Sequence, residues 1–213
     1  MIEIKNVEIV GWRPAIRGMR NPMNSWDRSD SEFEGNDIIF GDNDHERAMA
    51  LSKGGPVHAK YRRMITVYLD ILAPLYWWKE FDTYKVGTVC NSCSTMHRIH
   101  ERKFTLNDFS HEHLIDSEIV DGKQSVYLGY LELVVNKLNV ARARFLETKD
   151  KKYWWQMIQL LPSSYNQKRT IQLNYEVLSN MYESRKNHKL DEWREFCNWI
   201  ESLPYKELII TEE

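Results

Sequence analysis

Residues 64–81 read MITVYLDILAPLYWWKEF, and this stretch contains the clearest pair of elements in the chain. In its first part apolar residues alternate with other residues, and the apolar set is Ile65, Val67, Leu69 and Ile71. A period of two predicts a β-strand over residues 64–73 with one buried face. Pro74 follows, where the first turn of a helix tolerates a proline. We therefore predict that this strand leads directly into a helix that carries Trp77, Trp78 and Phe81.

Further strand and helix patterns lie on both sides of this stretch. Residues 2–10 alternate Ile and Val with charged residues, which predicts a half-buried strand. Helical spacing and end signals predict helices over residues 44–52, 125–148, 153–161, 172–185 and 190–203. Residues 13–44 are rich in Asn, Asp, Ser, Gly and Pro, and predict a long irregular loop. With no repeat or clear linker, we expect one α+β domain over residues 1–213, in which an antiparallel or mixed sheet packs with several helices.

The composition restricts the class of protein. Of the 213 residues 42% are hydrophobic and 28% are charged, which is typical of a folded globular chain. The net charge of −2 argues against general binding to a nucleic-acid backbone, so we expect no nucleic-acid partner. No apolar stretch is long enough to span a bilayer, and the first residues begin a strand pattern instead of a signal peptide. We therefore expect no membrane partner and a cytoplasmic location.

Aromatic residues and cysteines give two further indications. The chain holds eight Trp, eleven Tyr and seven Phe, which predict either a bulky core or surfaces that stack on planar ligands. On the last predicted helix, Trp193, Phe196 and Trp199 share one stripe and are expected in the core. Three cysteines are too few for a disulfide framework.

Short motifs exclude some chemistries and leave others open. The chain has no phosphate-binding loop of the Walker or Rossmann type and no nucleophile elbow. The spacing Cys90-x2-Cys93-x3-His97-x2-His100 combines residue types that bind zinc, but it is more compact than the usual zinc-finger frame. A zinc-binding interaction module is therefore a distant hypothesis, and we expect no metal.

Polar residues gather along the helix predicted over residues 172–185. Asn174, Asn180 and Arg185 cannot all belong to its apolar stripe, and His188 follows shortly after the helix. A helix C-terminus favours cations, so one interpretation is that Arg185 only caps the helix and is solvated. The alternative is a polar ledge of two amides, an arginine and a histidine beside a ligand that requires donors.

Two segments, read together, resemble the flavin-dependent thymidylate synthases. In residues 73–93 the Ala-Pro, the aromatic helix and the distance to Cys93 are similar to that family, in which Arg-His-Arg is followed after seven residues by Ser. The second segment places Leu161-Pro162, Asn174, Asn180 and Arg185 on the family's Leu-Pro, two Asn and catalytic Arg. His188 and Trp193 follow, and His58 stands where the family has a flavin-contacting His.

The resemblance implies roles for particular residues. Arg185 and Cys93 match the catalytic positions beside the pyrimidine. The positions that match the flavin site are His58, Tyr84, Lys85, Asn91, Asn174, Asn180 and His188. Those that match the nucleotide site are Glu80, Thr83, Ser94, Thr95 and again Arg185.

The resemblance also implies an activity and an assembly. A protein of this kind transfers a one-carbon unit from methylene-tetrahydrofolate to dUMP, with FAD as cofactor and NADPH as reductant, and assembles as a homotetramer with sites between subunits. The fixed Arg185 would favour the ionised pyrimidine ring and so activate its carbon for attack.

The sequence departs from the family at several of these positions. Thr83-Tyr84-Lys85 replaces Arg-His-Arg, Thr95 and Ile158 replace arginines at the nucleotide phosphate, and Cys93 replaces the Ser. Two alternatives therefore stay open beside the thymidylate synthase hypothesis. One is a flavin-dependent enzyme for another pyrimidine nucleotide, and the other is a non-catalytic binding protein on the same scaffold.

Overall fold

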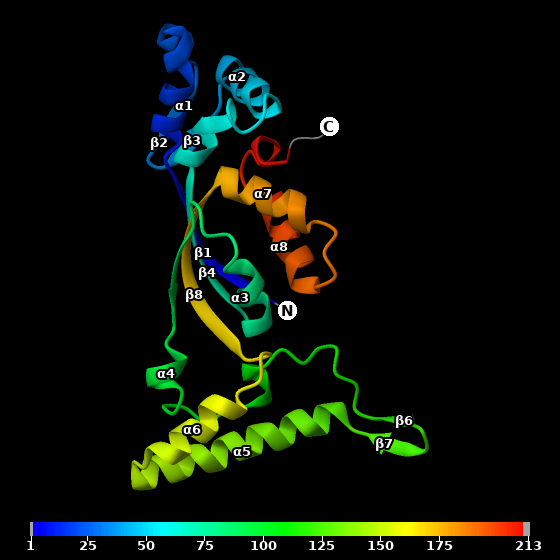
Figure 1. Cartoon of the computed structure of the whole chain (residues 1–213). Helices are drawn as coiled ribbons and strands as arrows, with labels where there is room; N and C mark the ends of the chain where they lie inside the picture. The colour runs from blue at the N-terminus through cyan, green and yellow to red at the C-terminus, as the bar shows by residue number, and fades with distance from the viewer. Residues whose placement is uncertain (1, 211–213) are drawn as a thin grey trace. The chain divides into compact units, whose positions relative to one another are not determined.

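The structure is a computed structural model that describes residues 2–210 (Figure 1). Its contacts divide the chain into two compact units. Unit 1 comprises residues 72–79 and 92–169, and unit 2 comprises residues 2–71, 80–91 and the segment from residue 170 onward. Helices and strands both contribute substantially, so the α+β class is confirmed. That all 213 residues form one domain stays a prediction.

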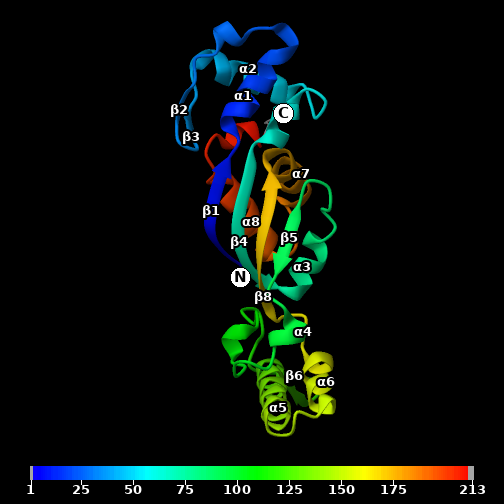
Figure 2. The same cartoon turned by 90° about the vertical axis from the view of Figure 1, so that its left-hand side faces the viewer.

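A four-stranded sheet has the order β1-β4-β8-β5 (Figure 2). The strands are β1 (Glu3–Val10), β4 (Thr66–Pro74), β8 (Asn166–Asn174) and β5 (Val89–Ser92). In β4 the side chains of Val67, Leu69 and Ile71 are at most 1% exposed, as the period of two predicts. Pro74 ends this strand, and helix α3 (Leu75–Phe81) follows directly. The predicted strand-to-helix unit is therefore confirmed, but Pro74, which was predicted in the first turn of the helix, is the last residue of the strand.

Strand β8 corrects the prediction of a helix over residues 172–185. The strand continues to Asn174, and helix α7 spans only Tyr175–Arg185. Ile171 and Leu173 are both buried and lie two residues apart, which is the period of a strand. The side chain of Asn174 then caps α7 by accepting a hydrogen bond from the amide of Val177 at 3.0 Å.

The prediction of a long irregular loop over residues 13–44 is wrong. The segment forms helix α1 (Trp12–Arg20), two 3-10 turns (Asn21–Met23 and Trp26–Arg28) and a hairpin of β2 (Glu32–Glu34) with β3 (Asp37–Ile39). In α1 the buried apolar residues Trp12, Ala15, Ile16 and Met19 follow helical spacing. Gly11 precedes them with a φ of 95°, and a Cβ there would lie 2.0 Å from the carbonyl oxygen of Met64. The helix was not predicted because many polar residues surround its short apolar face in the sequence.

Unit 1 is built around two consecutive helices. They are α5 (Tyr127–Thr148) and α6 (Lys151–Leu160), which confirms both predicted helices to within two residues at each end. The buried residues Leu131, Val135, Leu138, Ala141, Met157, Ile99, Phe104 and Phe109 form their common core. The short helix α4 (Thr95–Arg98), the 3-10 turn Leu106–Asp108 and the hairpin of β6 (Glu118–Val120) with β7 (Lys123–Ser125) complete the unit.

Unit 2 contains the remaining helices. They are α2 (Asp42–Lys53), the 3-10 helix Ala59–Met64, α7, α8 (Asp191–Glu201) and the 3-10 turn Lys206–Leu208. Trp193 and Phe196 of α8 are fully buried, and the ring of Phe81 stacks on Trp193 with 6.4 Å between centroids. In unit 1, Trp77 and Trp78 are also 0% exposed. These tryptophans belong to the core and are closed to ligands.

The long helices do not resemble membrane spans. Within residues 2–210, every helix is too short or too polar to cross a bilayer.

Candidate functional site

The best candidate site lies in unit 2, around the carboxylate of Glu80 at the end of α3. Its Oε2 accepts a hydrogen bond from Nη1 of Arg185 at 2.7 Å and from Nε1 of Trp193 at 3.1 Å. Nε2 of His188 lies 3.3 Å from the same oxygen. Arg185 ends α7, Trp193 belongs to α8, and His188 lies between these helices. One carboxylate oxygen therefore connects α3 to the α7–α8 corner.

The guanidinium of Arg185 is fixed on several sides. Its Nε donates a hydrogen bond to the hydroxyl of Tyr84 at 2.8 Å. Its central carbon lies 4.7 Å from the ring centroid of Trp193 and 5.5 Å from that of Tyr84. The side chain is 18% exposed, and Nη2 has no hydrogen bond to any described residue. The orientation of the guanidinium plane is thus fixed before any ligand binds, while the edge that carries Nη2 is available to a ligand.

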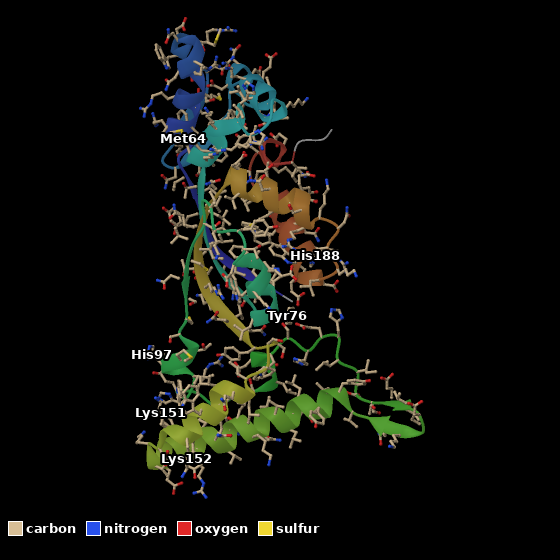
Figure 3. All side chains as sticks on the ribbon, viewed as in Figure 1. Met64, Tyr76, His97, Lys151, Lys152 and His188 are labelled. Carbon is tan, nitrogen blue, oxygen red and sulfur yellow. The ribbon has the colours of Figure 1, made fainter. Side chains whose placement is uncertain are left out.

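His188 has a defined hydrogen-bonding role. Its Nδ1 accepts a hydrogen bond from the amide of Leu190 at 3.2 Å. Because an accepting nitrogen carries no proton, the neutral ring has its hydrogen on Nε2, which faces Glu80. We assign this tautomer from the hydrogen bonds. Nε2 of His188 therefore faces the carboxylate of Glu80 at 3.3 Å. Figure 3 labels His188 in the segment between α7 and α8.

A small pocket opens beside Tyr84. It has a volume of about 280 Å³, and its lining comprises Phe81, Asp82, Tyr84, Lys85, Thr88 and Cys90. The hydroxyl oxygen of Thr88 is buried and has no hydrogen-bond partner among the described residues. Buried hydroxyls are normally paired, so a water molecule or a group of a ligand is expected to bind this one. The pocket therefore combines an aromatic ring, an ammonium group and an orphaned hydroxyl, which suits a planar ligand that carries phosphate.

The loop between α3 and β5 approaches α7 closely. Gly87 has a φ of 76°, and a Cβ there would lie 3.0 Å from Val177 and 3.1 Å from Nδ2 of Asn174. Both the positive φ and the close approach favour glycine. Asn174 is occupied as the cap of α7, so its Oδ1 is already engaged, while its Nδ2 faces this loop.

The structure brings together some of the predicted residues. Contacts join Glu80, Tyr84, Arg185 and His188, and Lys85 lines the pocket beside Tyr84. Thr83, which is exposed, joins this cluster because its hydroxyl and its amide donate hydrogen bonds to the backbone carbonyl of Glu80 at 2.7 and 3.1 Å. Within the described part of unit 2, no hydrogen bond or ion pair joins the exposed residues His58, Asn91 and Asn180 to the cluster. Their proposed roles at a ligand stay predictions.

Cys93, Ser94 and Thr95 belong to unit 1. They line a pocket of about 320 Å³ whose basic residues are Arg98, Arg102 and Lys168. The carbonyl of Cys93 accepts a hydrogen bond from Nε2 of Gln167 at 2.8 Å, and Ser94 caps α4. No sequence pattern predicted a role for these basic residues. Their nearness to Cys93 along the chain was the available signal for Arg98 and Arg102.

Two other residues of the unit 2 site were also missed. Trp193 was expected in the core and in the segment that resembles the family, with no role at the site, but its indole nitrogen also donates a hydrogen bond to Glu80. Thr88 lies three residues after Lys85 in the matched segment, and nothing in the sequence marks its hydroxyl as buried. Among residues 2–210 no three His, Cys, Asp or Glu side chains gather at a metal-binding distance. The zinc hypothesis therefore gains no support from the geometry.

Comparison with known proteins gives matches at the level of structure. No protein-family model matches the sequence, and the search of curated proteins gives no match. A crystal structure of thymidylate synthase X from Helicobacter pylori with FAD and dUMP has a TM-score of 0.69 and 17% identity, and the match covers 100% of this chain and 98% of that one. A second structure of the flavin-dependent enzyme from that organism, complexed with FAD and dUMP, has a TM-score of 0.66 and 17% identity over 99% and 97% of the two chains.

A third similar structure is a UMP/dUMP methylase, PolB, from Streptomyces cacaoi, bound with 5-Br UMP. It has a TM-score of 0.62 and 12% identity over 95% of this chain and 88% of that one. The chain therefore has the fold of the flavin-dependent thymidylate synthases, and the resemblance found in the sequence is confirmed at that level.

Proposed function

We propose that this chain is a flavin-dependent enzyme that transfers a one-carbon unit to a pyrimidine nucleotide, with dUMP as the first candidate. The observation that carries the proposal is the guanidinium of Arg185, which three neighbouring side chains hold in place with one edge left open. The shared fold supports it, since two similar structures contain FAD and dUMP.

Arg185 would act on the pyrimidine ring. A cation beside the ring stabilises its ionised form, and the added electron density makes the ring carbon a better nucleophile. Glu80, Tyr84 and Trp193 set the position of the cation before the substrate arrives, so less reorganisation is needed during the reaction. Glu80 also offsets part of the charge of Arg185, so it weakens the attraction of the cation for an anionic ligand.

The residues around Tyr84 fit the flavin. The Tyr84 ring offers a stacking surface, Lys85 a charge for phosphate, and Thr88 an unpaired hydroxyl. Asn174 and His188 would contribute polar contacts, and we extend this role to His58, Asn91 and Asn180 from the resemblance. When bound, the reduced flavin supplies the hydride, with NADPH as its reductant.

The same proposal assigns the nucleotide and the folate. Glu80, Thr83, Ser94 and Thr95 would contact the nucleotide, and the Cys93 thiol would lie beside the pyrimidine. Methylene-tetrahydrofolate would supply the one-carbon unit. We also propose a homotetramer in which the sites form between subunits.

A second candidate is an enzyme for another pyrimidine nucleotide. It is favoured by the similar UMP/dUMP methylase and by the altered phosphate positions Thr95 and Ile158. A non-catalytic binding protein on this scaffold is the third candidate, because Thr83-Tyr84-Lys85 replaces Arg-His-Arg.

Tritium release separates these candidates. The FAD-loaded protein is incubated with methylene-tetrahydrofolate, NADPH and either dUMP or UMP that carries tritium at carbon 5. We expect release from dUMP, because carbon 5 must lose its hydrogen when it gains the one-carbon unit. Release from UMP alone would favour the second candidate. Bound FAD with no release from either nucleotide would contradict the thymidylate synthase activity.

A further inference from the structure

Unit 2 contains a cavity that shares no residue with the candidate site. Its volume is about 670 Å³, against about 280 Å³ for the pocket beside Tyr84. Its walls come from β1, the first residue of α1, the hairpin strand β3, and the end of α8 with the residues that follow. Figure 2 shows β1 at the edge of the four-stranded sheet, with the hairpin beside its end. A cavity of this volume accommodates a small organic molecule.

Apolar and aromatic side chains form most of the cavity wall, and the aromatic ones are Trp12, Trp199 and Tyr205. The ring of Tyr205 meets that of Trp12 edge-on, with 5.7 Å between centroids. The hydroxyl of Tyr205 donates a hydrogen bond to the carbonyl of Ile38 at 3.0 Å and accepts one from the amide of Phe40 at 3.2 Å. These contacts fix the Tyr205 ring to the hairpin. Rings that are fixed in advance offer a planar ligand apolar surface at little cost in side-chain entropy.

Three polar groups of the cavity wall lack partners within the chain. Nε1 of Trp12 and Nε1 of Trp199 have no hydrogen-bond acceptor among residues 2–210. Trp12 is 3% exposed, and buried indole groups are normally paired, so a water molecule or an acceptor atom of a ligand is expected to bind this N–H. The carboxylate of Asp37, at the exposed start of β3, also forms no hydrogen bond or ion pair with any described residue.

The charge of the cavity restricts the class of ligand. Among the described residues that line it, Asp37 is the only one with a formal charge, so the wall offers no cation to a phosphate group. A carboxylate accepts two parallel hydrogen bonds from two adjacent N–H groups. A heterocycle presents such a pair where an amino group lies beside a ring N–H. The indole N–H groups require the opposite, an acceptor such as a ring nitrogen or a carbonyl oxygen.

We propose that this cavity binds a planar nitrogen heterocycle without phosphate, which carries an amino group beside a ring N–H, as a guanine base does. Asp37 accepts hydrogen bonds from that edge, an indole N–H donates to a ring acceptor, and the aromatic wall packs against the ring. An alkylammonium ion would satisfy Asp37 but leave both indole groups unpaired. This site is separate from the flavin and nucleotide sites proposed above, because FAD and dUMP both carry phosphate.

The first test compares guanosine with inosine, which differs from guanosine only by the absence of the amino group. Both nucleosides are titrated into the purified full-length protein and followed by calorimetry. We expect the Kd for inosine to be about three- to tenfold higher than that for guanosine, because one hydrogen bond to Asp37 is lost. Equal affinities for the two nucleosides, or no binding of guanosine at millimolar concentration, would overturn the proposal.

The second test removes the carboxylate. Asp37→Asn keeps the size of the side chain, and we expect it to raise the Kd for guanosine about three- to tenfold at an unchanged circular dichroism spectrum. The matched control is Glu34→Gln, which removes an exposed carboxylate from the residue paired with Asp37 in the same hairpin but outside the cavity, and is expected to bind guanosine as the wild type does. Equal guanosine affinities in both variants would contradict recognition by Asp37. FAD binding is expected to be the same in both, so a failure here is separate from a failure of the proposed function.

Discussion

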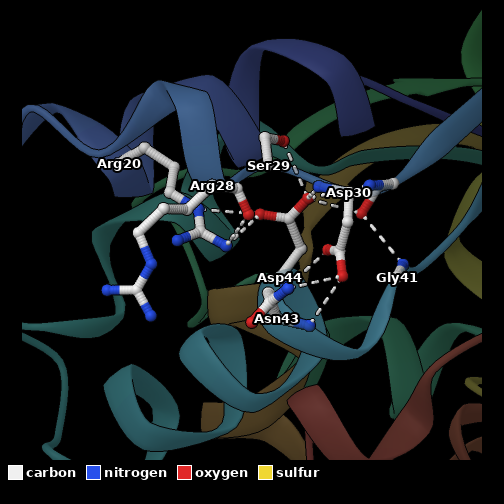
Figure 4. A network of polar contacts seen from close by, with 8 residues as sticks. Arg20, Arg28, Ser29, Asp30, Gly41, Asn43 and Asp44 are labelled. Carbon is white, nitrogen blue, oxygen red and sulfur yellow. Dashed lines mark hydrogen bonds and ion pairs between the residues drawn. The ribbon is translucent and has the colours of Figure 1, made fainter.

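Two of the arginine–carboxylate clusters in unit 2, around Asp44 and around Glu80, differ in how far they are exposed. Asp44 is 0% exposed and receives donors on both oxygens (Figure 4). The donors are Nε and Nη2 of Arg20, the hydroxyls of Ser29 and Ser31, and the amides of Asp30 and Ser31. Glu80 is 35% exposed, and the Arg185 that it binds keeps one edge unpaired within the described residues. A saturated buried cluster stabilises the fold, whereas an open, half-buried cluster is available to a ligand.

The largest expected effect is on stability at Asp44. Asp44→Asn removes the charge that compensates buried Arg20, and it replaces an acceptor of hydrogen bonds by a donor. We expect the free energy of unfolding to fall by about 3–5 kcal/mol in urea denaturation. Asp42→Asn, at an exposed position two residues earlier, is the control and is expected to cost about 1 kcal/mol or less. Equal losses for the two variants would contradict a stabilising role for the buried cluster.

The free energy of unfolding is also expected to depend on pH through Asp44. Burial alone raises the pKa of Asp44, but hydrogen bonds from Ser31, Ser29 and Arg20 outweigh it and the net pKa is lowered. A lowered pKa in the folded state contributes stability that is complete above the unfolded pKa of about 3.9 and is lost as the pH falls through the folded pKa. The wild type is therefore expected to lose more unfolding free energy than Asp44→Asn between pH 5 and pH 2. Parallel pH profiles would assign acid sensitivity to other groups.

The open cluster is tested by Arg185→Ala. We expect nucleotide-dependent turnover to fall about 10²–10³-fold, because the fixed cation beside the ring is lost. FAD binding is expected to persist, and the unfolding free energy to change by about 1 kcal/mol or less because the ion pair is partly exposed. Arg194→Ala removes an exposed, ion-paired arginine of α8 as the control. Full activity in Arg185→Ala would show that Arg185 has only a capping role.

The orphaned hydroxyl of Thr88 gives a smaller effect. Thr88→Val keeps the shape of the side chain and removes the hydroxyl. We expect the Kd for FAD to rise about two- to twelvefold, as the loss of one hydrogen bond implies, with no loss of folding stability. Thr66→Val on β4 is the matched control. A flavin affinity that is unchanged in Thr88→Val would remove this hydroxyl from the flavin site.

The smallest effect is expected from Glu80→Gln. It removes the negative charge that competes for Arg185 and keeps the size of the side chain. We expect the Kd of the FAD-loaded protein for dUMP to decrease by up to about fivefold in calorimetry, because a partly exposed ion pair is worth about 0.2–1 kcal/mol. Glu183→Gln, which removes an exposed ion pair on α7, is the control. Weaker binding in Glu80→Gln would mean that the loss of positioning of Arg185 outweighs the loss of competition for its charge, which would contradict this prediction.

The two clusters also differ in how far the sequence predicts them. Strand β4 and helix α3 follow from apolar spacing, and Arg185 and His188 follow from the resemblance. The Asp44 cluster was not predictable, because its serines and aspartates have the composition of a loop and act through contacts between α1 and α2. The role of Glu80 at the centre of the site depends on Trp193, which is 113 residues away along the chain. Local pattern carries no information about such a pair.

The most direct measurement of the central claim is a titration of the purified protein with FAD, followed by its visible absorbance. We expect a yellow protein that binds FAD to saturation, with weakened binding in Thr88→Val and preserved binding in Arg185→Ala. A colourless protein that takes up no added FAD would contradict the assignment of the Tyr84 pocket to flavin and, with it, the proposed function.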